Sequence, residues 1–341
     1  MQRMFFSWLI LVGLSGCASD ATQTGDANAS NQEGELEQVD WLTAWRTSPR
    51  GRSSHAFAFD RWGGQSPTGS SEEEISLWDA VGNQVSLVDW DEPRIQRAAN
   101  FYARNQRFLD VISDRAAPYF HFVLDEIQKR SMPVEIALLP VIESAYQPSA
   151  TSSRHAAGLW QLIPGTARRW GVDFAHGYDG RRDVFASTNA ALDYLQKLND
   201  EFAGDWLLAM AAYNCGENGV ERAIQRNLAR GRPTDFWSLD LPSETRAFVP
   251  KILGLAAVIS EPSSYGVQLK TLRDIPIVPV RVEYSLDLER VAELAEVPLY
   301  QVEKLNPALR HGRTQEDGGH VLLPAEQAGL FEDRLAELDL Q

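Results

Sequence analysis

The spacing of apolar residues changes along this chain, and each change marks a predicted boundary. From Glu72 to about residue 260, apolar residues recur three and four positions apart, which is the spacing of one buried face of a helix. We expect Ser187 or Thr188 to cap the clearest helix, whose buried stripe is Ala191, Leu192, Leu195, Leu198 and Phe202. We therefore predict a mainly α-helical domain over residues 72–260.

A second, smaller unit is predicted after a linker. Residues 261–279 alternate prolines with β-branched residues, as a linker leading into strands does. Residues 280–341 then form the second unit. It contains two predicted strands, 280–282 and 321–324, and two predicted short helices, 288–294 and 299–305. We expect a small α+β module at this end.

The first 17 residues have the pattern of a targeting segment. Arg3 precedes an apolar core, Met4 to Leu14, that is too short to span a bilayer. The core ends in Leu-Ser-Gly-Cys at Cys17, which resembles the lipobox of bacterial lipoproteins. The resemblance implies a lipid on Cys17. Ala18, in place of Asp, implies an outer-membrane lipoprotein facing the periplasm. A cleaved signal peptide with a chance cysteine is the alternative.

Composition narrows the possible partners. Residues 18–71 are polar or rich in Gly, Ser and Pro, which predicts a flexible tether. The net charge of −15 argues against binding nucleic acid or anionic lipid through bulk charge. If Cys17 carries lipid, Cys215 has no partner for an intramolecular disulfide. The histidines lack the spacing of metal ligands and no phosphate-binding loop appears, so we expect no metal and no other cofactor. We also expect the protein to be a monomer.

The candidate chemistry lies between Val134 and Gln161. An uncharged apolar run, Ile136–Ile142, leads directly to Glu143. On a helix, the apolar positions 136, 139 and 140 share a face with Glu143, while Glu135 is expected to reach water. Desolvation raises the pKa of a carboxyl group, and a protonated Glu can act as a general acid. The alternative is a Glu that turns to solvent where its helix ends.

The residues after Glu143 follow a family pattern. Ser144, Ser152 and the block Gly158-Leu159-Trp160-Gln161 stand at set intervals. This pattern resembles the catalytic signature of the lysozyme-like lytic transglycosylases of bacterial cell walls. The block Ala-Tyr-Asn-Cys-Gly, residues 212–216, resembles their second signature. Leu-Pro-Ser-Glu-Thr at 241–245 resembles the branch typified by membrane-bound lytic murein transglycosylase D.

The resemblance implies a fold and a reaction. The fold is the lysozyme-like helical domain of the goose-type and SLT proteins, and the partner is the glycan strand of peptidoglycan. Glu143 would protonate the oxygen between MurNAc and GlcNAc, and then take the proton from the C6 hydroxyl that attacks C1, which leaves a 1,6-anhydro ring. Most glycoside hydrolases need two carboxylates, and the motif here supplies only Glu143.

The same resemblance suggests roles for other side chains. Ser144 and Ser152 would orient Glu143 or the N-acetyl group, Gln161 and Asn214 would hold sugar amides, and Tyr213 would steady Glu143. Some assignments stay open. Trp160 either lines the groove or packs below it. Glu244 either interacts with the helix dipole in the first turn of a helix capped by Ser243, or lines the groove. In the loop 173–183, Tyr178, Asp179, Arg182 and Asp183 face a groove, or Arg182 and Asp183 only pin the loop by a salt bridge.

The C-terminal unit resembles a degenerate LysM module, a family that binds glycan chains through GlcNAc. The usual Gly-Asp-Thr-Leu opening is missing, and Ser285 to Leu288 stand in its place. Glycan binding and a purely structural remnant are both open.

Two other functions remain in competition. One is a hydrolase of the same fold, in which Asp179 or Asp183 would position a water molecule. The other is a lipid-anchored wall-binding protein with an inactive catalytic domain. The intact Glu143, Gln161 and Tyr213 argue against the inactive domain.

Overall fold

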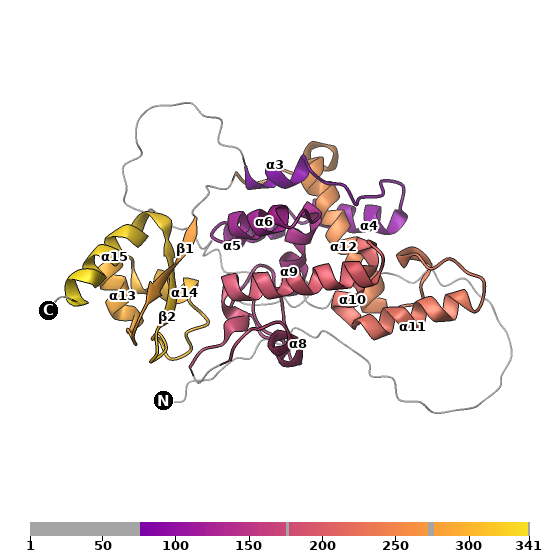
Figure 1. Ribbon diagram of the computed structural model, residues 1–341. Coiled ribbons are helices and arrows are strands. Elements are labelled where there is room, and N and C mark those ends of the chain that lie inside the picture. The colour runs from indigo at the N-terminus through magenta and orange to yellow at the C-terminus, as the bar shows by residue number, and fades with distance from the viewer. Residues whose placement is uncertain (1–75, 175–176, 272–275, 340–341) are drawn as a thin grey trace, which may run out of the picture.

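A computed structural model describes residues 76–174, 177–271 and 276–339. The predicted signal segment 1–17 with Cys17, and the tether 18–71, lie outside the described residues. The described chain forms a helical domain followed by a small module (Figure 1). The fold is mainly α, as the periodicity predicts. Among the described helices, none combines the length and the apolar character needed to cross a bilayer.

The helical domain contains ten α-helices and four short 3₁₀ turns within the described residues. They are α3 (Leu77–Gly82), α4 (Pro93–Ala103), α5 (Gln106–Ala116), α6 (Phe120–Lys129), η1 (Val134–Leu138), α7 (Leu139–Ser144), α8 (Pro164–Arg169), η2 (Gly180–Arg182), α9 (Val184–Glu201), α10 (Trp206–Cys215), α11 (Glu217–Leu228), η3 (Phe236–Ser238), α12 (Ser243–Ser260) and η4 (Pro262–Tyr265).

Helix α12 forms the centre of this domain. It is apolar on nearly all sides and packs against α3, α4 and α10. At Gly254 the backbones of α12 and α4 approach so closely that a Cβ atom there would lie 2.6 Å from the Cβ of Ala98. The α7 segment also packs on α12, and the charge of Glu244 in the first turn of α12 acts on Glu143 in α7.

The C-terminal module is built on two antiparallel strands, β1 (Ile277–Val282) and β2 (Gly319–Pro324), with Val280 opposite Val321. Helices α13 (Leu288–Ala295), α14 (Leu299–Leu305) and α15 (Ala325–Asp339) complete it. Pattern reading located the strands and α13 and α14, but it missed α15. One face of the sheet, with Val280 and Val321, packs against buried residues of the helices such as Phe331 on α15, and together they form the core of the module.

Three local expectations were wrong. Asp183, and not Ser187 or Thr188, caps α9, because its side chain accepts the N–H groups of Phe185 and Ala186. Both alternatives lie inside the helix and are buried. Ser243 is the first residue of α12, and Pro242 precedes it at the N-cap position.

The third correction concerns Glu135, which is fully buried and does not reach water. The turn η1 precedes α7, so residues 134–144 are not one regular α-helix and Glu135 points inward. One of its carboxylate oxygens accepts the backbone N–H groups of Ser86 and Leu87, each at 2.6 Å. The carboxylate thereby fixes the chain between α3 and α4 on the rest of the domain.

We expect Glu135→Ala to destabilise the protein by about 2–4 kcal/mol, because it removes the acceptor of two backbone N–H groups and opens a cavity at a fully buried side chain. Glu135→Gln keeps an acceptor oxygen and should lose less. Urea unfolding followed by circular dichroism measures both. Equal stability of the Ala variant and the unmodified protein would contradict this role.

Candidate active site

Glu143 lies at the end of a very short helix. Helix α7 has six residues and ends because Ala145 adopts a left-handed conformation with φ of 49°. Tyr146 follows with φ of 55°, so the chain reverses immediately after Glu143. Both residues carry a Cβ, and such conformations persist only where the surroundings hold them. Tyr146 provides that hold, because its ring is buried and its hydroxyl donates to the carbonyl of Ala137 at 3.1 Å.

The surroundings of Glu143 favour its protonated form. Burial is the larger cause and the negative charge of Glu244 the second, and together they raise the pKa of Glu143 to about 8. The carboxyl group is therefore neutral near pH 7 and carries a proton that it can donate. The apolar run before Glu143 is the sequence signal of this desolvation.

The two predicted serines contact backbone groups near Glu143. Ser144 is buried, and its hydroxyl donates to the carbonyl of Leu159 at 2.8 Å, which ties α7 to the loop that follows. Ser152 is also buried, and its oxygen accepts the N–H groups of Arg154 and Ala156 at 3.3 and 3.1 Å. These contacts suit residues that shape the loop beside Glu143.

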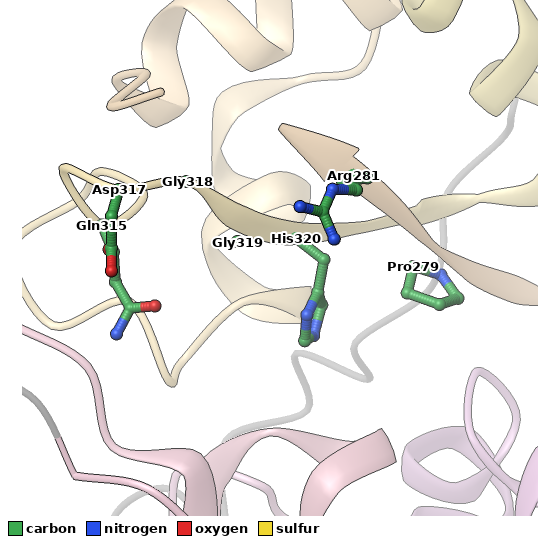
Figure 2. A pocket seen from close by; sticks show the side chains of 7 residues that line it. All are labelled: Pro279, Arg281, Gln315, Asp317, Gly318, Gly319 and His320. Atoms are coloured by element: carbon green, nitrogen blue, oxygen red, sulfur yellow. The ribbon is translucent and has the colours of Figure 1, made fainter. Parts of the chain in front are cut away.

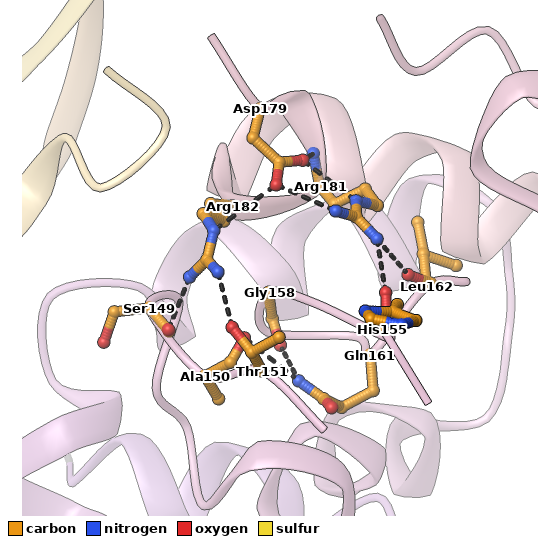
Figure 3. Close-up of polar contacts among 10 residues, drawn as sticks. All are labelled: Ser149, Ala150, Thr151, His155, Gly158, Gln161, Leu162, Asp179, Arg181 and Arg182. Atoms are coloured by element: carbon orange, nitrogen blue, oxygen red, sulfur yellow. Dashed lines mark hydrogen bonds and ion pairs between the residues drawn. The ribbon is translucent and has the colours of Figure 1, made fainter. Parts of the chain in front are cut away.

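The motif loop, which we define as residues 149–162, folds back on itself. Ala157 forms backbone bridges with Thr151 and Leu162, and the side chain of Gln161 donates to the carbonyl of Gly158 at 2.8 Å (Figure 3). Trp160 is fully buried, and its indole N–H donates to the hydroxyl of Thr188 at 2.9 Å. Trp160 therefore packs below the loop, which settles one of the open alternatives.

Gly158 is required by its position. Its φ is +86°, and a Cβ atom there would lie 1.6 Å from the carbonyl oxygen of Arg181. The loop 177–183 therefore passes directly against the motif loop at this residue.

Helix α10 places the second signature, residues 212–216, beside the motif loop. Tyr213 donates its hydroxyl to the carbonyl of Trp160 at 2.7 Å. Burial first, and then the charge of Glu143, raise the pKa of Tyr213 well above its ordinary value, so the two side chains lie close to each other. Asn214 accepts the hydroxyl of Thr245 at 2.7 Å and hydrogen-bonds Glu244. The end of α10 and the start of α12 thus meet beside Glu143.

A second carboxylate and a lysine belong to this neighbourhood. Burial raises the pKa of Glu244, while the charges of Lys251 and Arg154 and the Asn214 hydrogen bond oppose the rise. Burial lowers the pKa of Lys251 to about 8, against the effect of Glu244. Sequence reasoning left Glu244 undecided and missed Lys251. The available signal was their spacing, since residues seven apart lie on one face of a helix.

The loop aspartates proposed for a hydrolase are engaged elsewhere. Asp179 is buried and pairs with Arg181 at 2.9 Å and Arg182 at 3.4 Å. Burial raises the pKa of Asp179, but the hydrogen bond and charge of Arg181 outweigh it, and the net shift is downward. Asp183 is buried beside His320. Arg182 and Asp183 therefore pin the loop, although their partners are Asp179 and His320 and not each other.

Comparison with known proteins identifies related sequences. Residues 124–235 match the model of the "Transglycosylase SLT domain", and residues 277–340 match "Lytic transglycosylase MltD, LysM-like domain". The first match contains Glu143, the motif loop and Tyr213.

Two curated proteins are similar over long stretches. The chain is 39% identical to "Membrane-bound lytic murein transglycosylase D" of Escherichia coli (strain K12) over 262 residues, which are 76% of this chain and 58% of that protein. It is 36% identical over 185 residues to "Putative tributyltin chloride resistance protein" of Alteromonas sp. (strain M-1), covering 54% of this chain and 89% of that one. The chain thus spans less than two thirds of the first relative.

A solved structure, the 70 kDa soluble lytic transglycosylase SLT70 from Escherichia coli, aligns with 52% of this chain and 32% of its own at 19% identity. The TM-score is 0.35.

We expect Gly158→Ala to destabilise the protein by about 2–4 kcal/mol, because the new methyl group must displace the Arg181 backbone and the φ angle is strained. Gly165→Ala is the matched control, since no atom lies within 4 Å of a Cβ atom at that position. Thermal unfolding compares them. Equal effects of the two substitutions would contradict the close approach at Gly158.

Glu143→Gln should stabilise the protein at neutral pH. The pKa of Glu143 rises from its ordinary 4.5 to about 8 on folding, so its stabilising effect is full below pH 4.5 and is lost as pH rises through 8. A neutral Gln escapes this loss, and we expect an advantage of about 1–3 kcal/mol at pH 8 and almost none at pH 4.5. Urea unfolding at both pH values measures the difference. An advantage that does not grow with pH would contradict the raised pKa.

Proposed function

This chain belongs to the SLT family of lytic murein transglycosylases, in the branch of membrane-bound lytic murein transglycosylase D, and on that basis we propose that it is a peptidoglycan lyase. Its substrate is the MurNAc-β-1,4-GlcNAc bond, its product carries a 1,6-anhydroMurNAc end, and its role is remodelling of the cell wall. The observation that carries the proposal is the partly buried carboxyl group of Glu143, whose desolvation raises its pKa to about 8.

The reaction uses Glu143 twice. The protonated carboxyl first donates its proton to the glycosidic oxygen as the bond to C1 breaks, and positive charge develops on the MurNAc ring. The resulting carboxylate then accepts the proton of the C6 hydroxyl, whose oxygen attacks C1 and closes the anhydro ring. Glu143 ends the cycle protonated, and no water enters the product. A pKa of about 8 suits both steps, because either form is accessible near neutral pH.

The neighbouring residues support these steps. Tyr213 lies close enough to Glu143 for its carboxylate charge to raise the pKa of the phenol. Gln161 and Asn214 present partly exposed side chains, which suits binding of sugar amides. We assign Ser144 the task of holding the motif loop against α7, since its hydroxyl donates to the carbonyl of Leu159. We assign Ser152 the task of shaping the motif loop from within, since its oxygen accepts an N–H group of that loop.

The place of action follows from the N-terminal segment. We propose that a lipid on Cys17 anchors the protein in the outer membrane, where residues 18–71 let the catalytic domain reach the wall from the periplasmic side. The relative from Escherichia coli is named as membrane-bound. Labelling with a radioactive or clickable fatty acid, with Cys17→Ala as control, tests the anchor.

The first test of the activity is mass spectrometry of the products released from purified sacculi. We expect 1,6-anhydroMurNAc ends, and we expect Glu143→Gln to release at least about 100-fold less, which is the usual contribution of a general acid. Reducing MurNAc ends would identify a hydrolase. Binding of sacculi without any release would identify a wall-binding protein. A Glu143→Gln variant with full turnover would reject the assignment of Glu143.

Glu244 should raise the upper pH limit of the activity. Its negative charge raises the pKa of Glu143, so Glu244→Gln should lower that pKa and move the alkaline side of the pH–rate profile to lower pH. Glu221→Gln, an exposed position on α11, is the control. Rates of anhydro-product release from pH 5 to 10 measure the shift. An unmoved or upward-shifted profile would contradict the coupling.

A further inference from the structure

The C-terminal module contacts the helical domain through a backbone pairing. The N–H of Asp179 donates to the carbonyl of Ala308 at 2.9 Å, and the N–H of Arg310 donates to the carbonyl of Gly177 at 2.8 Å. Tyr178 and Leu309 lie opposite each other between these bonds. Two loops far apart in sequence therefore form a short antiparallel ladder. The backbone groups of Ala308 and Arg310 that make it are directed to the helical domain.

A contact between the partly exposed His320 and the buried Asp183 lies beside this ladder. The imidazole Nε2 of His320, on strand β2, lies 2.6 Å from the Oδ2 atom of Asp183. The hydroxyl of Tyr178 donates to the same oxygen at 3.0 Å, while the other oxygen caps α9. Asp183 is only 4% exposed, and His320 of the module is one of the groups that cover its carboxylate.

Apolar contacts extend the same interface. Ile277, Leu305 and Leu322 come from the module, yet they pack within the core of the helical domain. The part of the sheet's outer face that carries Ile277 and Leu322 is therefore buried, while Arg281 on the same face stays exposed.

The loop gripped by the module also holds the motif loop. Arg181 donates to the carbonyl of His155 at 2.6 Å, and Arg182 donates to the carbonyl of Ser149 and to the hydroxyl of Thr151 (Figure 3). The backbone of Arg181 packs directly on Gly158. A continuous set of contacts thus runs from His320 through the loop 177–183 to the motif loop.

The motif loop in turn holds the groups around Glu143. The carbonyl of Leu159 accepts the hydroxyl of Ser144, the residue next to Glu143, and the carbonyl of Trp160 accepts the hydroxyl of Tyr213. A displacement of the motif loop therefore also moves Ser144 and Tyr213, the two residues near Glu143 whose hydroxyl groups it binds.

We propose that the C-terminal module acts as a brace for the active site, in which His320 and Asp183 are positioning residues that hold the motif loop against Glu143. In this role the loop 308–310 and the buried part of the sheet's outer face bind the catalytic domain of the same chain. They do not bind a glycan strand. The expected effect on catalysis rests on the proposed function, whereas the expected support of the motif loop does not.

Protonation of His320 controls the brace. The hydrogen bond that His320 donates to the carboxylate of Asp183 raises the pKa of His320 against the effect of burial. The stabilising contribution of the pair is therefore full below the ordinary pKa of the imidazole and is lost as pH rises through the raised pKa. Besides Asp183 and Tyr178, the ionisable side chains that share a pocket with His320 among the described residues are Arg281 and Asp317. They line with it an open pocket of about 460 Å³, through which water reaches the ring (Figure 2).

Hydrogen exchange of the full-length chain in detergent tests the brace without requiring activity. His320→Gln removes the charge and Asp183→Asn keeps the helix cap but removes the carboxylate. Arg290→Gln, in an exposed ion pair on α13, is the matched control. We expect exchange over residues 149–162 to be about tenfold faster in the first two variants, since a hydrogen bond to a charged group typically stabilises by that ratio or more. The control should exchange like the unmodified chain.

The pH dependence separates a positioning role from general weakening. After correction for intrinsic rates, protection of the motif loop in the unmodified chain should fall as pH rises through the pKa of His320, and His320→Gln should show no such step. Anhydro-product release by both variants should fall about three- to tenfold, with the control unchanged. Unchanged exchange over 149–162, or faster exchange with full turnover, would overturn the proposal. If the unmodified chain releases no anhydro products, the proposed function fails while the exchange data still decide whether the module braces the loop.

Discussion

A carboxyl group that stays protonated near neutral pH must be kept from water, and the surroundings of Glu143 depend on this requirement. Burial provides most of the pKa shift, and Glu244 adds to it. The desolvation has to be maintained by structure, since a side chain at a chain reversal could otherwise turn outward. The short α7 helix, the left-handed residues after it and the buried ring of Tyr146 prevent that movement. The left-handed residues and the desolvated carboxyl group lower the stability of the fold at this point, as is common at functional sites.

The parts that sequence predicted well are those with a local physical cause. The 3.6-residue period placed most helices, and the apolar run before Glu143 indicated a desolvated acid. The two signatures were expected to meet, and the bond between Tyr213 and the Trp160 carbonyl brings them together. The roles assigned to Ser144, Ser152, Gln161 and Asn214 in binding substrate stay predictions.

The parts that sequence missed depend on partners distant along the chain. Glu135 was expected in water, because nothing near it in sequence indicates the N–H groups of Ser86 and Leu87. Asp183 was not chosen as the cap of α9, and its pairing with His320 could not be foreseen from either residue. Helix α15 lacks a strong apolar stripe, so its periodicity gave little signal. In each case tertiary packing decided between local options of similar free energy.

The ion pair between Asp183 and His320 joins residues 137 positions apart, and this separation has a consequence for how the protein matures. A chain emerges from the ribosome with its N-terminal part first. Contacts between residues this far apart form late, because closing the loop between them costs conformational entropy before the contacts can stabilise the structure. The segment that carries Glu143 is therefore made early, whereas the support of its loop is complete only after β2 has folded. A nascent or truncated chain holds every residue of both signatures and still lacks the finished architecture around them.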